Sequence, residues 1–193
     1  MAYHSGLKGW KLEDAAPLSE YRIKDSIAFR HDIMDPYPEI YNECDFIYGE
    51  PPWIHGAKVF DERAGVSGRK FTDLTARISE LVENLTIPVA LTAGAWGLKM
   101  LPKADAVVKT SIKGSPLSFC WIFYYRMDAL EDKGLGIIDQ VVDKYDVVGD
   151  WFCGYGNLAM EAYKKDKRFI VSDYVPECIG YIGKTIDEME KAK

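Results

Sequence analysis

The chain has 193 residues, of which 48% are hydrophobic, enough for the core of one α/β domain with little left for a second. Its 24 basic and 30 acidic side chains give a formal net charge of −6. This excludes a positive field over the whole protein that would attract nucleic acid, so contact with nucleic acid would need a local basic face or a partner. No apolar run approaches membrane-spanning length and no signal peptide opens the chain, so we expect a cytoplasmic protein without membrane contact.

Residues 1–20 show no sustained hydrophobic period, and we expect them to form a loosely structured arm before a single domain that spans residues 21–193. Residues 22–35 contain alternating apolar and polar side chains, which predicts a short strand or the start of a helix, and the prolines that follow end this element. His31 lies in this segment, and we interpret it as a surface or packing histidine.

A compact apolar run at residues 44–49 predicts a strand, and the sequence Glu-Pro-Pro-Trp follows it at Glu50, Pro51, Pro52 and Trp53. Two consecutive prolines cannot continue a strand ladder or a helix, so the strand must end there in a rigid turn. In open α/β sheets, ligands bind at the carboxyl ends of the strands. The turn is therefore either a candidate binding site or only a strand end at which Trp53 covers the core.

The next segment, residues 54–70, is rich in glycine and basic side chains. Its position and charge favour a loop that folds over a bound target and contacts phosphates, although the same composition is typical of an ordinary mobile loop. The candidates for substrate binding are His55, Lys58 and Arg69.

Residues 71–85 carry apolar side chains at helical spacing and predict a helix that covers the sheet. Residues 88–96 predict the next strand, so strand, helix and strand form a right-handed parallel unit. Residues 106–110 and 118–126 are further β segments, and the second is apolar enough to lie centrally in the sheet. Three basic side chains of this part either extend a basic rim or are only solvated surface: Lys109, Lys113 and Arg126.

The last third of the chain predicts a strand that ends at Asp150, a glycine turn at Gly154 and Gly156, a helix at about residues 158–165, and a second strand that ends at Asp173. Two glycines at such a turn let a ligand lie against the backbone and leave amide groups of the helix N-terminus free to donate. An acid that closes the next strand can accept hydrogen bonds from two ribose hydroxyls. These features favour a nucleoside pocket, although a Gly-x-Gly turn can also serve only tight chain geometry.

A helix is expected before this unit, beginning near Leu135, and an amphipathic helix after it, over residues 178–193. The four cysteines lack paired metal spacing, so we expect buried, reduced thiols and no metal site. They are Cys44, Cys120, Cys153 and Cys178.

The sequence Asp-Trp-Phe-Cys-Gly-Tyr-Gly-Asn at residues 150–157 resembles the Asp-Pro-Phe-Cys-Gly-Ser-Gly-Thr signature of the amino methyltransferases that modify DNA. Trp151, Tyr155 and Asn157 depart from that signature. The resemblance implies S-adenosyl-L-methionine as the cofactor. It assigns the following residues to cofactor binding: Asp150, Phe152, Cys153, Gly154, Gly156 and Asp173.

The sequence Glu-Pro-Pro-Trp resembles the Asp-Pro-Pro-Trp or Asn-Pro-Pro-Tyr catalytic loop of the same family, and this implies a catalytic role for Glu50, Pro51, Pro52 and Trp53. The exocyclic amine of adenine is a poor nucleophile, because its lone pair is delocalised into the ring. An acceptor side chain and a proline-held carbonyl can accept both amine hydrogens, while the aromatic ring stacks on the extruded base. Glu50 is one methylene longer than the usual acid, so the pocket is rebuilt, the substrate differs, or activity is lost.

A third block, Asp-Lys-Gly-Leu at residues 132–135, resembles the family's Gln-Lys-Pro-Leu element and implies that Lys133 helps to enclose the cofactor. The order of the three blocks is that of the beta-class enzymes. This implies a Rossmann-like methyltransferase fold, in which helices cover both faces of a mostly parallel sheet. Little of the chain remains for sequence recognition, which favours low specificity, a partner subunit or homodimer, or a small or single-stranded substrate.

The expected function is therefore N6-adenine methylation of DNA, which would be bound through a local basic face. Two alternatives stay open. In the first, the chain is a catalytically silent, methyltransferase-like partner or binding protein. In the second, it methylates RNA or a small molecule.

Overall fold

The computed structural model describes residues 15–52, 61–112, 115–131 and 137–192. Within these ranges the strands are β1 (Glu20–Ile23), β2 (Ser26–Arg30), β3 (Phe46–Gly49), β4 (Val89–Ala93), β5 (Ala106–Ile112), β6 (Ser115–Tyr125), β7 (Val147–Asp150) and β8 (Arg168–Asp173). The helices are the 3-10 helix η2 (Glu39–Glu43) and the α-helices α2 (Phe71–Asn84), α3 (Gly97–Met100), α4 (Ile138–Lys144), α5 (Asn157–Lys164) and α6 (Pro176–Lys191).

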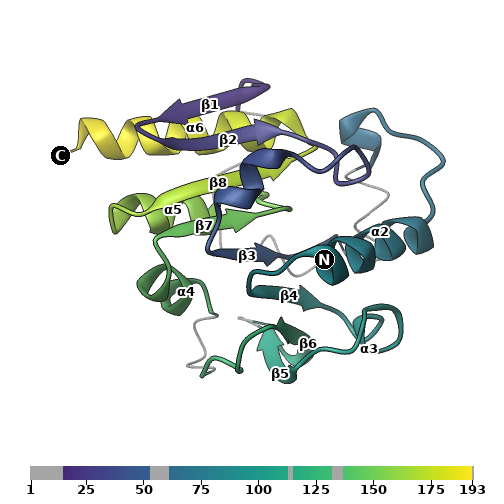
Figure 1. Cartoon of the computed structure of the whole chain (residues 1–193). Coiled ribbons are helices and arrows are strands. Elements are labelled where there is room, and N and C mark those ends of the chain that lie inside the picture. The colour runs from purple at the N-terminus through teal and green to yellow at the C-terminus, as the bar shows by residue number, and fades with distance from the viewer. Residues whose placement is uncertain (1–14, 53–60, 113–114, 132–136, 193) are drawn as a thin grey trace.

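The described strands form one 8-stranded sheet in the order β1-β2-β8-β7-β3-β4-β6-β5 (Figure 1). The five strands from β2 to β4 in this order are mutually parallel, whereas β1 and β6 run antiparallel to their neighbours. β5 pairs antiparallel with β6 and so runs in the direction of the parallel strands. The expected α/β architecture with a mostly parallel sheet is confirmed, as is the parallel unit of β3, α2 and β4.

The prediction that residues 118–126 lie centrally is wrong. These residues belong to β6, which lies second from the edge, between β4 and β5. The hairpin formed by β5 and β6 extends the sheet outward from β4, so β6 cannot reach the centre. Its dense apolar sequence has another cause, because alternate residues of β6 are buried on both faces of the sheet: Ile122 and Tyr124 on one, Phe123 and Tyr125 on the other.

Helices cover both faces of the sheet (Figure 1). α4, α5 and α6 pack on one face, where their buried side chains form a cluster with Phe46 and Tyr48 of β3. α2 and η2 pack on the other face, together with Ile47 of the same strand. The alternation along β3 follows from the period of two in a strand, and burial on both faces explains why the central strands are apolar without a polar side.

The C-terminal helix begins earlier than the sequence suggested. Pro176 occupies its first turn, where the missing N–H costs no intrahelical hydrogen bond. Cys178, Ile179, Ile182 and Ile186 recur at helical spacing and are fully buried. Residues 1–14 of the expected arm lie outside the described residues, whereas Ala15 is buried in a cluster with Val175 and Cys178. No described helix has the length and apolarity that crossing a membrane requires.

Candidate functional site

The two predicted turns leave the same edge of the sheet from neighbouring strands. β3 and β7 pair in parallel, with Tyr48 opposite Asp150, and the N–H of Trp151 donates to the carbonyl oxygen of Tyr48 at 3.2 Å. Glu50 follows β3, and Asp150 ends β7. The carboxyl ends of these strands therefore bring Glu50 and Asp150 together, although they are far apart in the sequence.

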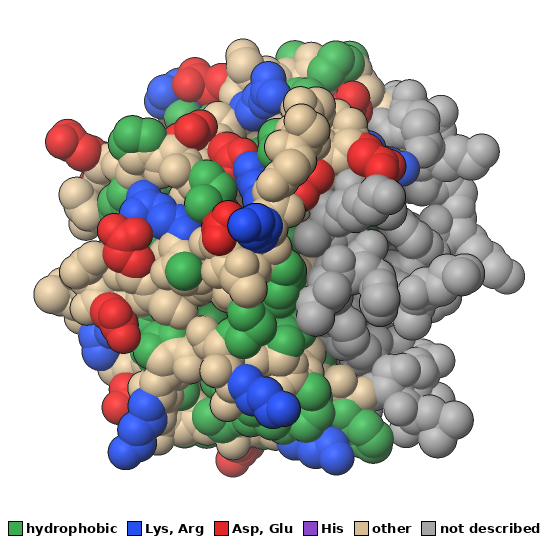
Figure 2. Space-filling model, turned by 90° about the vertical axis from the view of Figure 1, so that its right-hand side faces the viewer, with side chains coloured by type: hydrophobic (Ala, Val, Ile, Leu, Met, Phe, Trp, Pro, Cys, Tyr) green, Lys and Arg blue, Asp and Glu red, His purple; other side chains and the backbone are tan. Residues whose placement is uncertain are grey.

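A hollow at this edge is bordered by both turns. Pro52 comes from the first turn, Phe152 from the second, and Tyr174 directly follows β8. Figure 2 views the molecule from this edge, which is the right-hand side of Figure 1. The hollow measures about 10 Å³, which is room for roughly one water molecule. A ligand of nucleoside size must therefore lie beside the hollow or displace side chains that border it.

Two buried carboxylates hold the glycine turn in place. Asp150 accepts the N–H of Phe152 at 3.0 Å. Asp173 accepts the N–H of Gly154 at 2.9 Å through Oδ2 and the N–H of Val175 at 3.0 Å through Oδ1. A carboxylate has about four acceptor positions, and the N–H of Tyr174 and the thiol of Cys178 also donate to Asp173. The acid thus fixes the turn, and a ligand hydroxyl would have to replace one of these donors.

The two glycines of the turn have different surroundings. Both have positive φ, +48° at Gly154 and +74° at Gly156, a region that side chains with a Cβ avoid. Among the described residues, the nearest atom to a Cβ added at Gly154 would be the carbonyl oxygen of Phe152, at 4.0 Å. A Cβ at Gly156 would lie 2.4 Å from Cγ1 of the buried Ile182. Gly154 thus leaves open space for a ligand, whereas Gly156 is required for packing on α6.

The helix that follows the turn adds donors. Gly156 is the N-cap of α5, and the first N–H groups of an α-helix lack intrahelical acceptors. Leu158 and Ala159 are buried against the sheet, and this packing fixes the position of the helix N-terminus beside Gly154. Aligned N–H groups at such a terminus favour an acceptor or a negative group of a ligand.

The acids at this edge resist ionisation. Burial raises the pKa of Asp150 well above its usual range, and the neighbouring charges of Glu50 and Asp173 raise it further, while the N–H of Phe152 opposes the shift. Burial also raises the pKa of Asp173 to about 6, against the hydrogen bonds donated by Val175 and Gly154. Each additional negative charge makes ionisation of the next acid harder, and a cationic ligand here would lower these pKa values and favour the charged acids.

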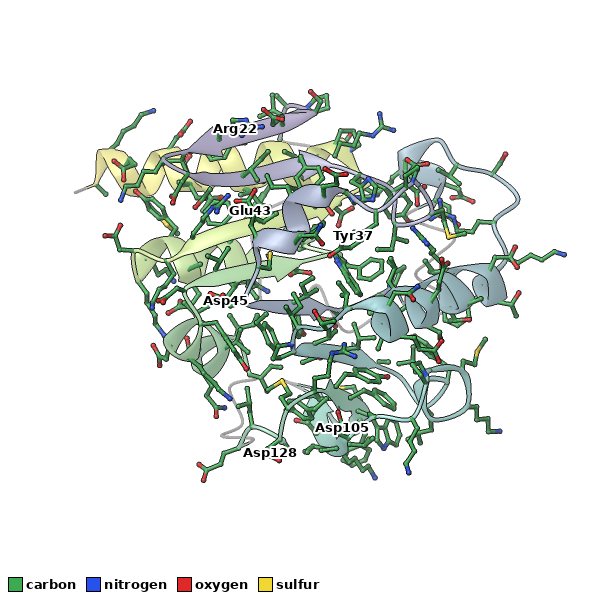
Figure 3. All side chains as sticks on the ribbon, in the orientation of Figure 1. Arg22, Tyr37, Glu43, Asp45, Asp105 and Asp128 are labelled. Atoms are coloured by element: carbon green, nitrogen blue, oxygen red, sulfur yellow. The ribbon has the colours of Figure 1, made fainter. Side chains whose placement is uncertain are left out.

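Trp151, which departs from the methyltransferase signature, is a core residue. Its side chain is fully buried, and its indole packs edge-on against Tyr37, which Figure 3 labels, with ring centroids 6.5 Å apart. Tyr41 lies beside Tyr37 and donates its hydroxyl hydrogen to the carbonyl oxygen of Asp150 at 2.9 Å. Aromatic packing beneath the turn thus restrains the backbone at Trp151, where the signature has a proline.

Arg69, a predicted substrate contact, is held within the protein. Its guanidinium pairs with Asp32 and, at 3.5 Å, with Asp61, and it lies 5.2 Å from the ring centroid of Tyr174. Only 11% of the side chain is exposed. A phosphate at this position would have to compete with two carboxylates for the same cation.

Sequence reasoning missed part of the border of the hollow. Tyr174, Asp32 and His31 all line it, and the N–H of His31 donates to the carbonyl oxygen of Asp173 at 3.0 Å. The only sequence signal was that Tyr174 directly follows the predicted acid. His31 and Asp32 reach the site because β2 pairs in parallel with β8, a pairing between distant segments that local patterns do not reveal.

Four predicted site residues lie outside the described residues: Trp53, His55, Lys58 and Lys133. The four cysteines are described; all are buried, as expected, and none forms a disulfide. Cys153 lies within the glycine turn, where its N–H donates to the carbonyl oxygen of Ser172 at 2.9 Å. Within the described part of the chain, no group of three or more His, Cys, Asp or Glu side chains is placed to hold a metal ion.

A larger groove, of about 340 Å³, lies at the opposite edge of the sheet. Its charged side chains pair with one another, Lys24 with Asp166 at 2.6 Å and Lys167 with Asp146. The groove contains neither predicted turn. Although this groove is larger, the convergent acids, the open glycine and the helix N-terminus favour the carboxyl edge as the functional site.

No known family model matches the sequence, and no curated protein matches it. Among solved structures, the complex of M1.HpyAVI with S-adenosyl-L-methionine (SAM) is 13% identical, with a TM-score of 0.51 over 83% of this chain and 98% of that one. Another M1.HpyAVI structure is 11% identical, with a TM-score of 0.54 over 82% and 97% of the two chains. A third structure is TTHA0409 of Thermus thermophilus, provisionally named a DNA modification methylase, in complex with S-adenosyl-L-methionine. It is 13% identical over 83% of this chain and 93% of that one, and its TM-score of 0.49 is too low for an argument. The chain thus has the α/β, Rossmann-like fold of M1.HpyAVI, as the sequence led us to expect.

Proposed function

We propose that the protein is a methyltransferase that uses S-adenosyl-L-methionine, and that its acceptor is the N6 amine of adenine in DNA. The observation that carries this proposal is the meeting of the two turns at one edge, where Pro52 and Phe152 border the same hollow. The fold adds support, because M1.HpyAVI, which shares it, was crystallised with S-adenosyl-L-methionine.

The residues at the carboxyl edge fit this cofactor. Gly154 leaves open space beside the backbone among the described residues, and a ribose hydroxyl can take the place of the weakest donor to Asp173, the thiol of Cys178. The cofactor carries a sulfonium and an ammonium, and a cation beside Asp150 would lower the raised pKa of this acid and favour its charged form. When bound, it supplies an electrophilic methyl group. We therefore assign Asp150, Phe152, Gly154 and Asp173 to its binding, and Gly156 to the packing that holds the turn.

The first turn would position the acceptor. Glu50 supplies a carboxylate and the adjacent proline turn supplies a carbonyl, and together these can accept both hydrogens of an exocyclic amine. This directs the nitrogen lone pair away from both acceptors. Pro51 is buried, which fixes the direction of the turn. In this proposal Trp53 stacks on the base, and Pro52 borders the space between base and cofactor.

The experiment is transfer of labelled methyl groups from S-adenosyl-L-methionine to DNA, RNA and nucleosides by the purified protein. We expect transfer to DNA, with the label in N6-methyladenine. Loss of one positioned acceptor typically costs about 10²–10³-fold in turnover, so Glu50→Ala should lose about that much while cofactor affinity, measured by calorimetry, stays within a few fold. Lys144→Gln, an exposed position on α4, is the matched control. Transfer to none of the substrates would reject the enzyme.

The small size of the hollow favours a second candidate, a methyltransferase-like protein that binds a partner without catalysis. Among the described residues, this hollow of about 10 Å³ is too small to hold a base. In that case cofactor binding or partner binding persists, Glu50→Ala changes neither, and no substrate receives a methyl group. Glu50→Asp, which restores the shorter acid, would then be the variant in which activity could appear.

A further inference from the structure

The hairpin of β5 and β6 presents aromatic rings and lysines beyond the end of β4. Ala93, the last residue of β4, lies opposite Trp121, and Trp121 lies opposite Lys109. Phe119 precedes Trp121 by two residues in β6. At the usual rise of a strand it therefore lies about 7 Å past the end of β4. The hairpin thus extends from the same carboxyl edge that carries Glu50 and Gly154.

The exposed side chains of this hairpin share one face of the sheet. Phe119, Trp121 and Phe123 alternate along β6, and Phe123 packs in the cluster that contains α2. Val107 and Lys109 lie directly opposite Phe123 and Trp121 and therefore point the same way. Phe119 is 43% exposed and Val107 is 44% exposed, which is unusual for large apolar side chains on a sheet face.

The lysine is organised over the rings. Nζ of Lys109 lies 4.0 Å from the ring centroid of Phe119 and 5.9 Å from that of Trp121. An ammonium in this position is attracted by the ring face and is held next to the aromatic surface. A nucleotide whose base stacked on the exposed part of this surface would have its phosphate within reach of the cation.

The charge of this region is opposite to that of the whole chain. The described residues between 94 and 124 carry three lysines, Lys99, Lys103 and Lys109, and one acid, Asp105. Asp105, labelled in Figure 3, precedes β5 and accepts the backbone N–H of Arg126, about 13 Å along the strand from Lys109. In the lower part of Figure 2, where β5, β6 and α3 lie, basic side chains stand among hydrophobic ones. Lys109 thus gives the aromatic surface a positive charge, although the net charge of the chain is −6.

Arg126, which the sequence placed on a possible basic rim, does not belong to this face. Its guanidinium donates to the carbonyl oxygens of Ile87 at 2.6 Å and Val82 at 3.0 Å. These bonds tie the end of β6 to α2 and to the segment between α2 and β4. The positive charge on the aromatic surface therefore comes from Lys109.

We propose that this aromatic and lysine surface (Lys109, Phe119 and Trp121) binds single-stranded DNA and guides it to the carboxyl-edge site. The inference rests on the proposed function, since it names the form of the substrate. β6 is two strand spacings from β3 and β5 is three, so the surface begins about 10–14 Å from the turn at Glu50. That distance corresponds to a few nucleotides, which a groove on a small domain accommodates.

The test is fluorescence anisotropy with a labelled 12-nucleotide single strand of mixed sequence, titrated at several salt concentrations. Each phosphate that a lysine neutralises contributes about −0.7 to the slope of log affinity against log salt, so Lys109→Gln should reduce the magnitude of the slope by about 0.7. Phe119→Leu keeps an apolar side chain but removes the stacking plane, and should weaken binding at least about fivefold. An unlabelled duplex of the same sequence should compete poorly, because its bases are not free to stack.

Lys144→Gln is the matched control, since Lys144 also lies over a ring, 5.3 Å from the centroid of Tyr145, and there the chain enters β7 at the opposite edge. It should leave binding unchanged. Thermal unfolding confirms that each variant folds, and sedimentation tests whether a second copy covers the surface. The inference is overturned if Phe119→Leu and Lys109→Gln bind as the wild type does, if the duplex competes equally, or if Phe119→Leu only dissociates a dimer. Normal binding without methyl transfer would instead refute the proposed function.

Discussion

Replacing each glycine of the turn by alanine should separate packing from ligand space. At Gly156 the φ of +74° is left-handed, which costs a residue with a Cβ about 1–2 kcal/mol. The new Cβ would also lie 2.4 Å from Cγ1 and 2.8 Å from Cδ1 of Ile182, an overlap that typically costs about 1–3 kcal/mol more in a packed core. Gly156→Ala should therefore lower the free energy of unfolding by about 2–5 kcal/mol.

Gly154→Ala should lower the free energy of unfolding only through the strained backbone, by about 1–2 kcal/mol, because no described residue crowds the new Cβ. Urea unfolding followed by circular dichroism measures both variants, and calorimetry with S-adenosyl-L-methionine should show that Gly154→Ala loses affinity although it folds. A double-mutant cycle with Ile182→Ala checks the cause, since the cost of Gly156→Ala should shrink when Ile182 is truncated. If the two alanine variants are equally stable, or the cycle shows no coupling, the assignment of Gly156 to packing is wrong.

Three further predictions concern charges near the site. The pKa of Asp173 is about 6 in the folded protein, above its ordinary value of 3.8. The unfolded chain therefore ionises first, and the free energy of unfolding falls by on the order of 3 kcal/mol as pH rises from about 4 to 6. Urea unfolding of Asp173→Asn should lack this part of the decline, and a pH profile identical to that of the wild type would contradict the prediction. Arg69→Met leaves Asp32 and Asp61 without their cation and should lower the unfolding midpoint by an amount equivalent to about 3 kcal/mol, whereas an unchanged midpoint would show that solvent screens the pair. Glu50→Gln removes a charge that raises the pKa of Asp150, so carboxyl NMR signals should show this pKa falling, and a rise or no change would refute their proximity.

The sequence predicted the elements around the glycine turn closely, because their signals are local. The strand to Asp150, the helix after the turn and the strand to Asp173 all appear within about one residue of their expected bounds. The strand before Glu50 and its parallel partner were also predicted correctly. In each case an apolar run is bounded by glycine or proline, whose backbone restrictions act within a few residues.

The sequence could not predict features that depend on distant partners. The apolar sequence of β6 suggested a central strand, yet its hairpin with β5 places it second from the edge of the sheet. Gly154 and Gly156 look alike in sequence, and only the position of Ile182 on α6 distinguishes them. The charge of Arg69 favoured a phosphate contact, but its two carboxylate partners come from separate segments. Such pairings are set by tertiary packing, which local patterns do not encode.

The central claim is that the turns at Glu50 and Gly154 form one cofactor and substrate site. The most direct measurement is a titration of isotope-labelled protein with S-adenosyl-L-methionine, followed by amide NMR shifts. We predict saturable shifts at both Glu50 and Gly154, with Lys24 and Lys167 in the groove at the opposite edge unaffected. Shifts confined to that groove, or none at millimolar cofactor, would contradict the account.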